Sequence, residues 1–212
     1  MDRAEPFIEA LPEVLPRAFF DRPVLQVARD LLGALLVRDL GRGRLLTGRI
    51  VEVEAYDGER DRASHAFRGR TARTEVMFGE PGHAYVYFIY GMHCCLNAVT
   101  GAEGTASAVL IRALAPVGGE RWMDPGRSPA GRIASGPGRL TRAFGIDRTL
   151  NRADLCAPGP LFLAHGEPVS ARRIARGERI GVEYAGAWAR KPWRFGVRGE
   201  RSLSRPFPPR RK

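Results

Sequence analysis

The sequence predicts an α+β fold, a single domain in which helices pack on a curved antiparallel β-sheet that carries a protruding β-hairpin. Three observations lead to this prediction. Extended apolar runs outnumber helical ones along the 212 residues. Most connections between these runs are short and contain glycine, which favours antiparallel neighbours over parallel strands joined by long crossovers. A chain of this length buries one substantial core rather than two.

The first expected elements are a helix and a hairpin. Pro23 and the apolar residues that follow it at helical spacing predict an amphipathic helix that stops near Gly33. Two extended runs, residues 35–40 and 45–56, flank a glycine-containing turn at residues 41–43 and predict a pair of strands.

Further strands are expected in six extended runs, which are residues 84–90, 93–100, 107–115, 160–164, 179–183 and 193–198. The Gly136-Pro137-Gly138 sequence should open a short helix over residues 139–144. The folded domain is expected to cover residues 15–198. The segment 1–14 and the basic, proline-rich tail 199–212 are expected to be flexible.

The charge favours a nucleic-acid partner. The formal net charge is +11 although 23 acidic residues are interspersed, so the excess belongs to a folded surface that should attract a polyanion. Only Lys191 and Lys212 are lysines, and arginine suits bidentate phosphate contacts, although an arginine-biased genome would give the same composition. We find neither a leader nor an apolar run of roughly 18 residues, so a cytoplasmic protein without a membrane partner is expected.

The cysteines predict neither a disulfide framework nor a metal site. Cys94, Cys95 and Cys156 are an odd set without metal-ligand spacing, so reduced thiols are expected. The segment 165–167 matches the first part of a zinc-deaminase signature, but the second part, PCxxC, does not follow.

One strand carries a cluster of polar side chains. Residues 50–56 alternate with a period of two, so one face of this strand should belong to the core, while Glu52, Glu54 and Tyr56 share the other. Two interpretations of the polar face stay open. It is either exposed to solvent or forms the wall of a pocket, because an aromatic ring beside two carboxylates is typical of a pocket as well.

A second candidate site is the hairpin that residues 85–90 and Gly91 predict, with Tyr90 near its tip. A tyrosine there could wedge into a base stack, as in proteins that flip bases. An aromatic stripe such as Tyr85 and Tyr87 is more often part of a core.

Two loops suit phosphate contacts. Residues 68–74 form a small basic loop with hydroxyl groups, and residues 136–139 present free amides at a helix start. A solvated loop explains the first segment equally well, and an ordinary helix entry is the favoured explanation of the second.

Taken together and in order, eleven motifs resemble the alkyladenine (3-methyladenine) DNA glycosylase family. The resemblance covers about residues 15–198 and rests on residues 51–56, His65, 77–78, 81–82, 85–87, 90–92, Asn97, 110–114, 136–140, 179–181 and 188–192. Two departures are Cys94, where an aromatic is expected, and Thr74, where related sequences carry asparagine.

The resemblance implies a DNA-repair enzyme, and we expect it to be monofunctional, because a lyase would need an amine and only Lys191, Lys212 and the terminal amine are present. It would flip alkylated or deaminated purines, of the 3-methyladenine, hypoxanthine and ethenoadenine class, out of duplex DNA and hydrolyse the bond to the sugar, leaving an abasic site. No metal or organic cofactor is implied, and a monomer is the default expectation. Glu54 matches the general base and Arg112 the residue beside the attacking water.

The resemblance also assigns binding residues. Tyr56, His65 and Tyr87 match the side chains that sandwich the flipped base, and Asn97 matches the position that disfavours guanine. The expected DNA contacts are Tyr90, which would fill the vacated stack, together with Met92, Arg73, Arg139, Arg190 and Lys191. Two alternatives remain, a DNA-binding protein without catalysis and a glycosylase that acts on RNA or free nucleosides.

Overall fold

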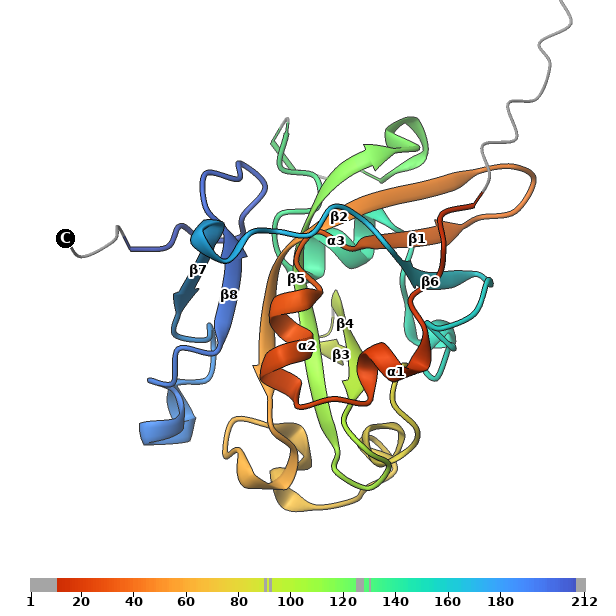
Figure 1. Cartoon of the computed structure of the whole chain (residues 1–212). Coiled ribbons are helices and arrows are strands. Elements are labelled where there is room, and N and C mark those ends of the chain that lie inside the picture. The colour runs from red at the N-terminus through yellow and green to blue at the C-terminus, as the bar shows by residue number, and fades with distance from the viewer. Residues whose placement is uncertain (1–10, 90, 92, 125–127, 130, 209–212) are drawn as a thin grey trace, which may run out of the picture.

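A computed structural model describes residues 11–89, 91, 93–124, 128–129 and 131–208 (Figure 1). Its core is one antiparallel sheet of eight strands, in which six strands have the order β3-β4-β5-β2-β1-β6, β8 also pairs with β2, and β7 pairs with β8. The strands are β1 (Leu35–Asp39), β2 (Leu45–Tyr56), β3 (Ala84–Ile89), β4 (His93–Thr100), β5 (Ser107–Gly118), β6 (Leu161–Ala164), β7 (Ile174–Gly177) and β8 (Arg194–Val197).

Short helices complete the fold. The α-helices are α1 (Arg17–Phe20), α2 (Val24–Asp30) and α3 (Pro137–Ala143). The 3-10 helices are η1 (Gly58–Arg60), η2 (His65–Arg68), η3 (Glu75–Phe78), η4 (Glu120–Trp122), η5 (Arg148–Leu150), η6 (Ala171–Arg173) and η7 (Glu183–Trp188). The α+β fold that the sequence predicts is therefore confirmed.

The central strand β2 organises the sheet. One of its edges pairs with β5, while along the other edge β1 pairs with residues 45–49 and β8 with residues 52–54. The pairing with β5 changes register on both sides of Glu52. Such bulges bend a strand and re-aim its side chains. At Glu52 and Glu54, β2 is thus paired on one edge with β8 and on the other with β5.

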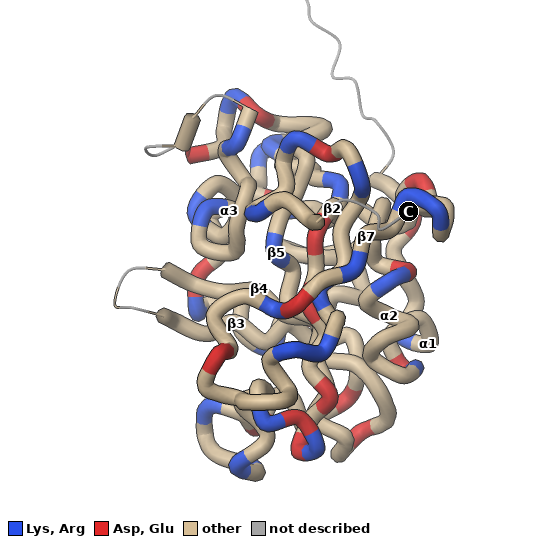
Figure 2. Tube along the Cα trace, turned by 90° about the vertical axis from the view of Figure 1, so that its left-hand side faces the viewer, with Lys and Arg blue, Asp and Glu red and all other residues tan. Residues whose placement is uncertain are grey.

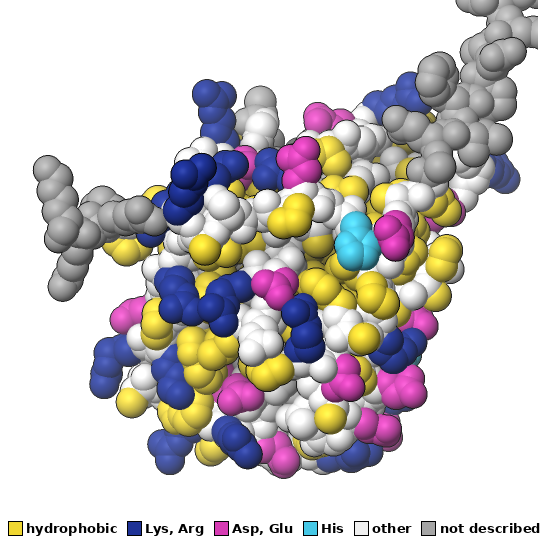
Figure 3. Space-filling model, viewed as in Figure 1, with side chains coloured by type: hydrophobic (Ala, Val, Ile, Leu, Met, Phe, Trp, Pro, Cys, Tyr) yellow, Lys and Arg dark blue, Asp and Glu magenta, His cyan; other side chains and the backbone are white. Residues whose placement is uncertain are grey.

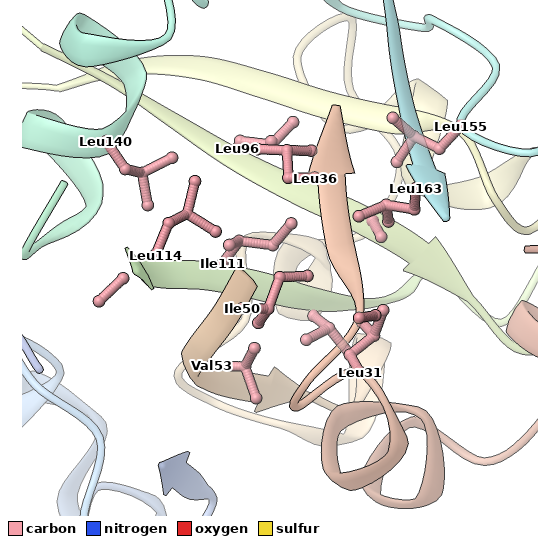
Figure 4. Packing of buried hydrophobic residues seen from close by; sticks show 14 of the residues in the cluster. Leu31, Leu36, Ile50, Val53, Leu96, Ile111, Leu114, Leu140, Leu155 and Leu163 are labelled. Carbon is pink, nitrogen blue, oxygen red and sulfur yellow. The ribbon is translucent and has the colours of Figure 1, made fainter. Parts of the chain in front are cut away.

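The core lies between the sheet and the α-helices (Figure 4). α2 packs on β2 and β5 and buries Val24, Val27 and Ala28, while α3 packs on β4 and β5 and buries Leu140. Full burial of one such leucine or valine side chain stabilises the fold by roughly 1.5–3 kcal/mol relative to exposure. At Gly48, a Cβ atom would lie 2.8 Å from the Phe144 ring, so glycine permits the close approach of β2 to the end of α3.

Most of the predicted elements are present. The helix after Pro23, the β1–β2 hairpin and the helix opened by residues 136–138 are confirmed. The β3–β4 hairpin projects from the body of the molecule in Figure 2, as expected. Tyr90 and Met92 lie outside the described residues. On the face that carries α1 and α2, basic and acidic side chains are interspersed (Figure 3).

The prediction of a strand at residues 179–183 is wrong. The preceding segment forms β7, and the chain then turns at Ile180 and Gly181 and enters η7. Arg179 explains the difference. Its side chain is fully buried in an ion pair with Asp61, and this contact is incompatible with continuation of the strand.

The described part of the tail contacts the sheet. Residues 202–207 lie against β8 and the buried Glu52 carboxylate, to which the Ser204 amide donates a 2.6 Å hydrogen bond. The Phe207 ring packs 3.8 Å from the Arg194 guanidinium. Residues 1–10 and 209–212 lie outside the described residues. The first of these ranges is most of the segment 1–14 that is expected to be flexible. Within the part of the chain that the structure describes, no helix is long and apolar enough to cross a membrane.

Candidate functional site

The polar face of β2 is buried, which settles the choice between a solvent face and an internal one. Glu52 and Glu54 are each 0% exposed. Burial of a carboxylate is costly unless hydrogen bonds and opposite charges compensate it. Both glutamates have such partners.

Glu54 accepts two hydrogen bonds and forms an ion pair with Arg112. The Tyr56 hydroxyl lies 2.8 Å from Oε2, the Ile180 amide nitrogen lies 2.8 Å from Oε1, and Nη1 of Arg112 lies 3.2 Å from Oε2. An ionised carboxylate offers about four lone-pair positions. The carboxylate therefore keeps acceptor capacity for a further donor, such as a water molecule.

Arg112 joins the two glutamates. Its Nε atom lies 3.2 Å from Oε1 of Glu52, and its Nη1 atom reaches Glu54. Burial disfavours the guanidinium charge, but the carboxylates of Glu54 and Glu52 overcome this effect and raise the pKa of Arg112 above its usual value. The side chain therefore carries its positive charge inside the protein.

A pocket of about 620 Å³ opens above these residues. The resemblance assigned six of its lining side chains to base recognition, catalysis or DNA contact, and the structure brings them together: Tyr56, His65, Arg73, Tyr87, Asn97 and Arg112. Apolar and aromatic walls with a few polar groups are typical of a small-molecule or base-binding site. Glu54 lies directly beneath the wall formed by Tyr56 and Arg112.

Aromatic rings dominate one side of the pocket. The His65 ring lies 4.6 Å from the Tyr87 ring, and the Tyr85 and Tyr87 rings lie 5.1 Å apart. Burial raises the pKa values of Tyr56 and Tyr87 well above the usual value, so both hydroxyls stay protonated. Tyr85 and Tyr87 thus face the pocket and the adjoining cluster rather than the main core.

His65 is neutral at neutral pH. Burial and the nearby Arg73 charge lower its pKa to about 4. Its Nδ1 atom lies 2.9 Å from the Tyr85 hydroxyl, which fixes the plane of the ring. Asn97 is held as well, because its Nδ2 group donates a 3.0 Å hydrogen bond to the Tyr85 carbonyl.

A buried ion pair that the sequence analysis did not single out supports the site. Nη2 of Arg179 lies 2.9 Å from Oδ1 of Asp61, and the guanidinium lies 4.7 Å from the centre of the Tyr56 ring. The next residue is Ile180, whose amide binds Glu54. Arg179 and Ile180 belong to a motif that carried the family resemblance, whereas Asp61 gave no signal of its own.

The residues expected to contact DNA have different surroundings. Arg73 lies over the Tyr87 ring at 5.0 Å and lines the pocket. Arg139 and Arg190 are exposed. Lys191 lies 3.5 Å from the centre of the Trp188 ring and 4.4 Å from that of Trp193.

The loop at residues 68–74 uses its hydroxyl groups internally. Oγ1 of Thr71 and Oγ1 of Thr74 lie 3.0 Å apart, and Thr74 also donates to the Gly69 carbonyl. Thr74, one of the departures from the family pattern, is therefore a buried residue that shapes the loop. Cys94, the other departure, is a buried free thiol, and its carbonyl accepts a hydrogen bond from Thr141.

Among the described residues, no group of three or more histidine, cysteine, aspartate or glutamate side chains could hold a metal ion. Cys95 lines the pocket, and burial raises the pKa of its thiol to about 11.

Comparisons with known proteins agree with one another. The family model described as methylpurine-DNA glycosylase matches residues 18–201. A protein of Methanocella arvoryzae is 54% identical over 198 residues, which are 92% of this chain and 98% of that relative. Relatives from Myxococcus xanthus and Streptomyces avermitilis are 52% and 49% identical, over 93% of this chain and 97% and 95% of their own lengths. All three relatives carry the provisional name 3-methyladenine DNA glycosylase.

Proposed function

The chain belongs to the methylpurine-DNA glycosylase family, and from this we infer that it is a DNA-repair glycosylase that releases damaged purines from duplex DNA by hydrolysis. The observation that carries the proposal is the placement of a buried carboxylate beneath the wall of an aromatic pocket. Glu54 meets this description through its hydrogen bond to Tyr56, which lines the pocket.

We assign Glu54 as the general base. In the proposed step it takes a proton from a water molecule as the water oxygen bonds to the sugar C1′ atom. The N-glycosidic bond breaks, and its electron pair leaves with the purine. Two hydrogen bonds and the ion pair with Arg112 already hold the Glu54 carboxylate, so it has a single orientation and keeps acceptor capacity for a water molecule. A positioned base of this kind contributes about 10²- to 10⁴-fold in rate.

Arg112 stands beside this position with its charge retained. Its guanidinium would hold the attacking water and balance the negative charge on Glu54. Glu54 becomes neutral only as it takes the proton from the water, and until then its negative charge stabilises the positive charge that develops on the sugar in the transition state. A group that is already in place needs no rearrangement at the moment of reaction.

The aromatic side chains would sandwich the purine. Tyr56, His65 and Tyr87 line the pocket, and a base turned out of the duplex would stack between such rings. Flipping costs a few kcal/mol and least for a weakly paired base, so damage itself contributes to selection. Asn97, held by its bond to the Tyr85 carbonyl, would crowd the exocyclic amine of guanine.

The substrates fall into two chemical classes. Purines alkylated at N3 or N7 are cationic and leave readily, whereas hypoxanthine and ethenoadenine are neutral and need a proton as they leave. We propose that both classes are accepted. The neutral His65 ring favours acceptance of the cationic bases, because a protonated imidazole in the pocket would repel them.

The enzyme is proposed to be monofunctional. Cleavage of the sugar–phosphate chain by a lyase would need an amine that forms a Schiff base. Lys191 is enclosed by Trp188 and Trp193 and is not among the pocket-lining residues. Lys212 lies outside the described residues. Strand breaks should therefore appear only after alkali or heat.

The test is release of free base from duplex oligonucleotides that carry hypoxanthine or ethenoadenine and from methylated DNA. Wild type is compared with Glu54→Gln, and Glu75→Gln, a carboxylate on the surface, is the matched control. The Glu54 variant should lose about 10²- to 10⁴-fold in single-turnover rate and keep its affinity for DNA. Glu75→Gln should behave as wild type.

Other outcomes would favour the alternatives. If wild type binds duplex DNA but releases none of these bases, it is a binding protein without catalysis. If it releases bases equally well from single-stranded nucleic acid or from free nucleosides, a duplex is not required.

A further inference from the structure

The C-terminal strap, which we define as residues 202–207, contacts the active-site charges from outside the sheet. Ser204 is its central residue. The Ser204 amide nitrogen lies 2.6 Å from Oε2 of Glu52, and its Oγ atom lies 2.7 Å from Oε1. Both bonds reach a carboxylate that is completely buried. Ser204 is separated from Glu52 by 152 positions in the sequence, so only the folded chain brings them together.

Several contacts hold the strap in place. Nη2 of Arg132 donates to the carbonyl of Leu203 at 3.2 Å. Arg194 of β8 donates to the carbonyls of Arg205 and Pro206 at 3.1 and 3.2 Å. The position of Ser204 is therefore determined on both sides along the chain.

Glu52 connects the strap to the proposed catalytic pair. Besides the two bonds from Ser204, it accepts from Arg112 at 3.2 Å and from Arg194 at 3.0 Å. Three of these bonds go to Oε1 and one goes to Oε2, and Glu52 is not among the residues that line the pocket. Glu52 is thus an unsuitable base but a rigid acceptor for Arg112.

Arg112 consequently has a partner on each side of its guanidinium. Nε points to Glu52, Nη1 to Glu54, and Nη2 lies 3.4 Å from Oγ of Ser204. A planar guanidinium presents its donors in a fixed fork, so these contacts determine both its position and its plane. Without Ser204, one edge of the fork loses its partner, and Glu52 keeps only its two arginine partners.

We propose that the strap is a working part of the active site, in which Ser204 positions Glu52 so that Glu52 holds Arg112 in the plane needed beside Glu54. Ser204 and Glu52 are positioning residues in this arrangement, because neither needs to touch the substrate. The proposal rests on the glycosylase function above and adds residues from the end of the chain to it.

The test compares Ser204→Ala with Ser204→Thr. Alanine removes the hydroxyl bonds and keeps the amide bond, whereas threonine keeps both. Ser204→Ala should slow single-turnover base release by about tenfold, since small misplacements of catalytic groups have effects of this size or larger. DNA affinity should stay within about twofold, because the lost interaction acts in the chemical step. Ser204→Thr should restore most of the rate.

Ser170→Ala is the matched control, because Ser170 is exposed and makes no side-chain capping bond. It should leave rate, affinity and melting temperature unchanged. In proton–nitrogen NMR spectra, the Arg112 Nε–H signal should shift in Ser204→Ala and stay in place in Ser170→Ala.

Three results would overturn the proposal. Ser204→Ala with the wild-type rate would show that the strap has no part in positioning. A loss of rate accompanied by equal losses of DNA affinity and melting temperature, without rescue by threonine, would show a purely structural role. If wild type itself releases no base, the proposed function fails and this inference fails with it, whereas the first two results leave that function intact.

Discussion

The hydroxyl of Tyr56 donates a 2.8 Å hydrogen bond to Oε2 of Glu54. The same tyrosine is part of the pocket wall, so one side chain contacts both the proposed base and the space for the substrate. Burial, followed by the charge of Glu54, raises the pKa of Tyr56 well above its usual value. The hydroxyl therefore stays protonated at neutral pH and remains a hydrogen-bond donor.

Tyr56→Phe should separate these two roles. Phenylalanine keeps the ring that would stack on the base and removes the donor to Glu54. We expect a single-turnover rate lower by about tenfold and DNA affinity within about twofold of wild type, because the missing bond holds the catalytic group. An unchanged rate would mean that the Ile180 amide and Arg112 orient Glu54 without help.

Protein stability should depend on pH through His65. Its pKa is lowered to about 4 in the folded protein from a usual 6.5, mainly by burial and then by Arg73. Between these values the unfolded chain binds more protons than the folded one, so stability rises with pH across this window and is lost as the pH falls through it.

Urea unfolding at several pH values between 4 and 7 measures this effect. His65→Gln should give a flatter dependence than wild type, and His165→Gln, at an exposed position, should not. If wild type and His65→Gln have parallel curves, His65 does not titrate as its burial implies.

The Arg179–Asp61 pair should matter more for stability than ion pairs on the surface. Both of its side chains are 0% exposed, and loss of one partner leaves the other charge buried and unpaired. Asp61→Asn should therefore lower the free energy of unfolding by about 3–5 kcal/mol. Glu75→Gln, which breaks a pair with the exposed Arg152, should cost about 0–1 kcal/mol. Equal effects in chemical denaturation would contradict the burial of the first pair.

The salt dependence of DNA binding should identify the arginines that contact phosphates. Arg190 is exposed near the pocket-lining segment 180–184. Arg190→Gln should reduce the slope of log affinity against log salt by about 1. Arg42→Gln, in the turn at the opposite end of β2 from Tyr56, should leave the slope unchanged. Identical slopes for both variants and wild type would remove Arg190 from the interface.

Local sequence patterns predicted most of the fold. The period-two alternation of residues 50–56 and the glycine turn at residues 41–43 are short-range features, and the β1–β2 hairpin follows from them. The helix after Pro23 likewise depends on spacing and a favoured first residue. These elements were predictable because the physics that forms them acts within a few residues.

The candidate site was predictable only in part. The family resemblance named Glu54, Arg112 and the aromatic residues, and the structure brings them to one pocket. The path of residues 179–183 was predicted incorrectly, because Arg179 forms an ion pair with Asp61, which lies 118 positions earlier in the chain. The periodicity of a short segment carries no information about a partner so far away in the sequence.

By itself, the sequence determined which side chains share a face of β2, since alternation along a strand follows from backbone geometry. Only the tertiary structure decided that this face is buried. Strand β8 and the C-terminal strap cover Glu52, and Arg112 and Arg194 compensate its charge. A carboxylate tolerates such a place only when donors and cations from distant parts of the chain converge on it, and that convergence exists only once the chain has folded.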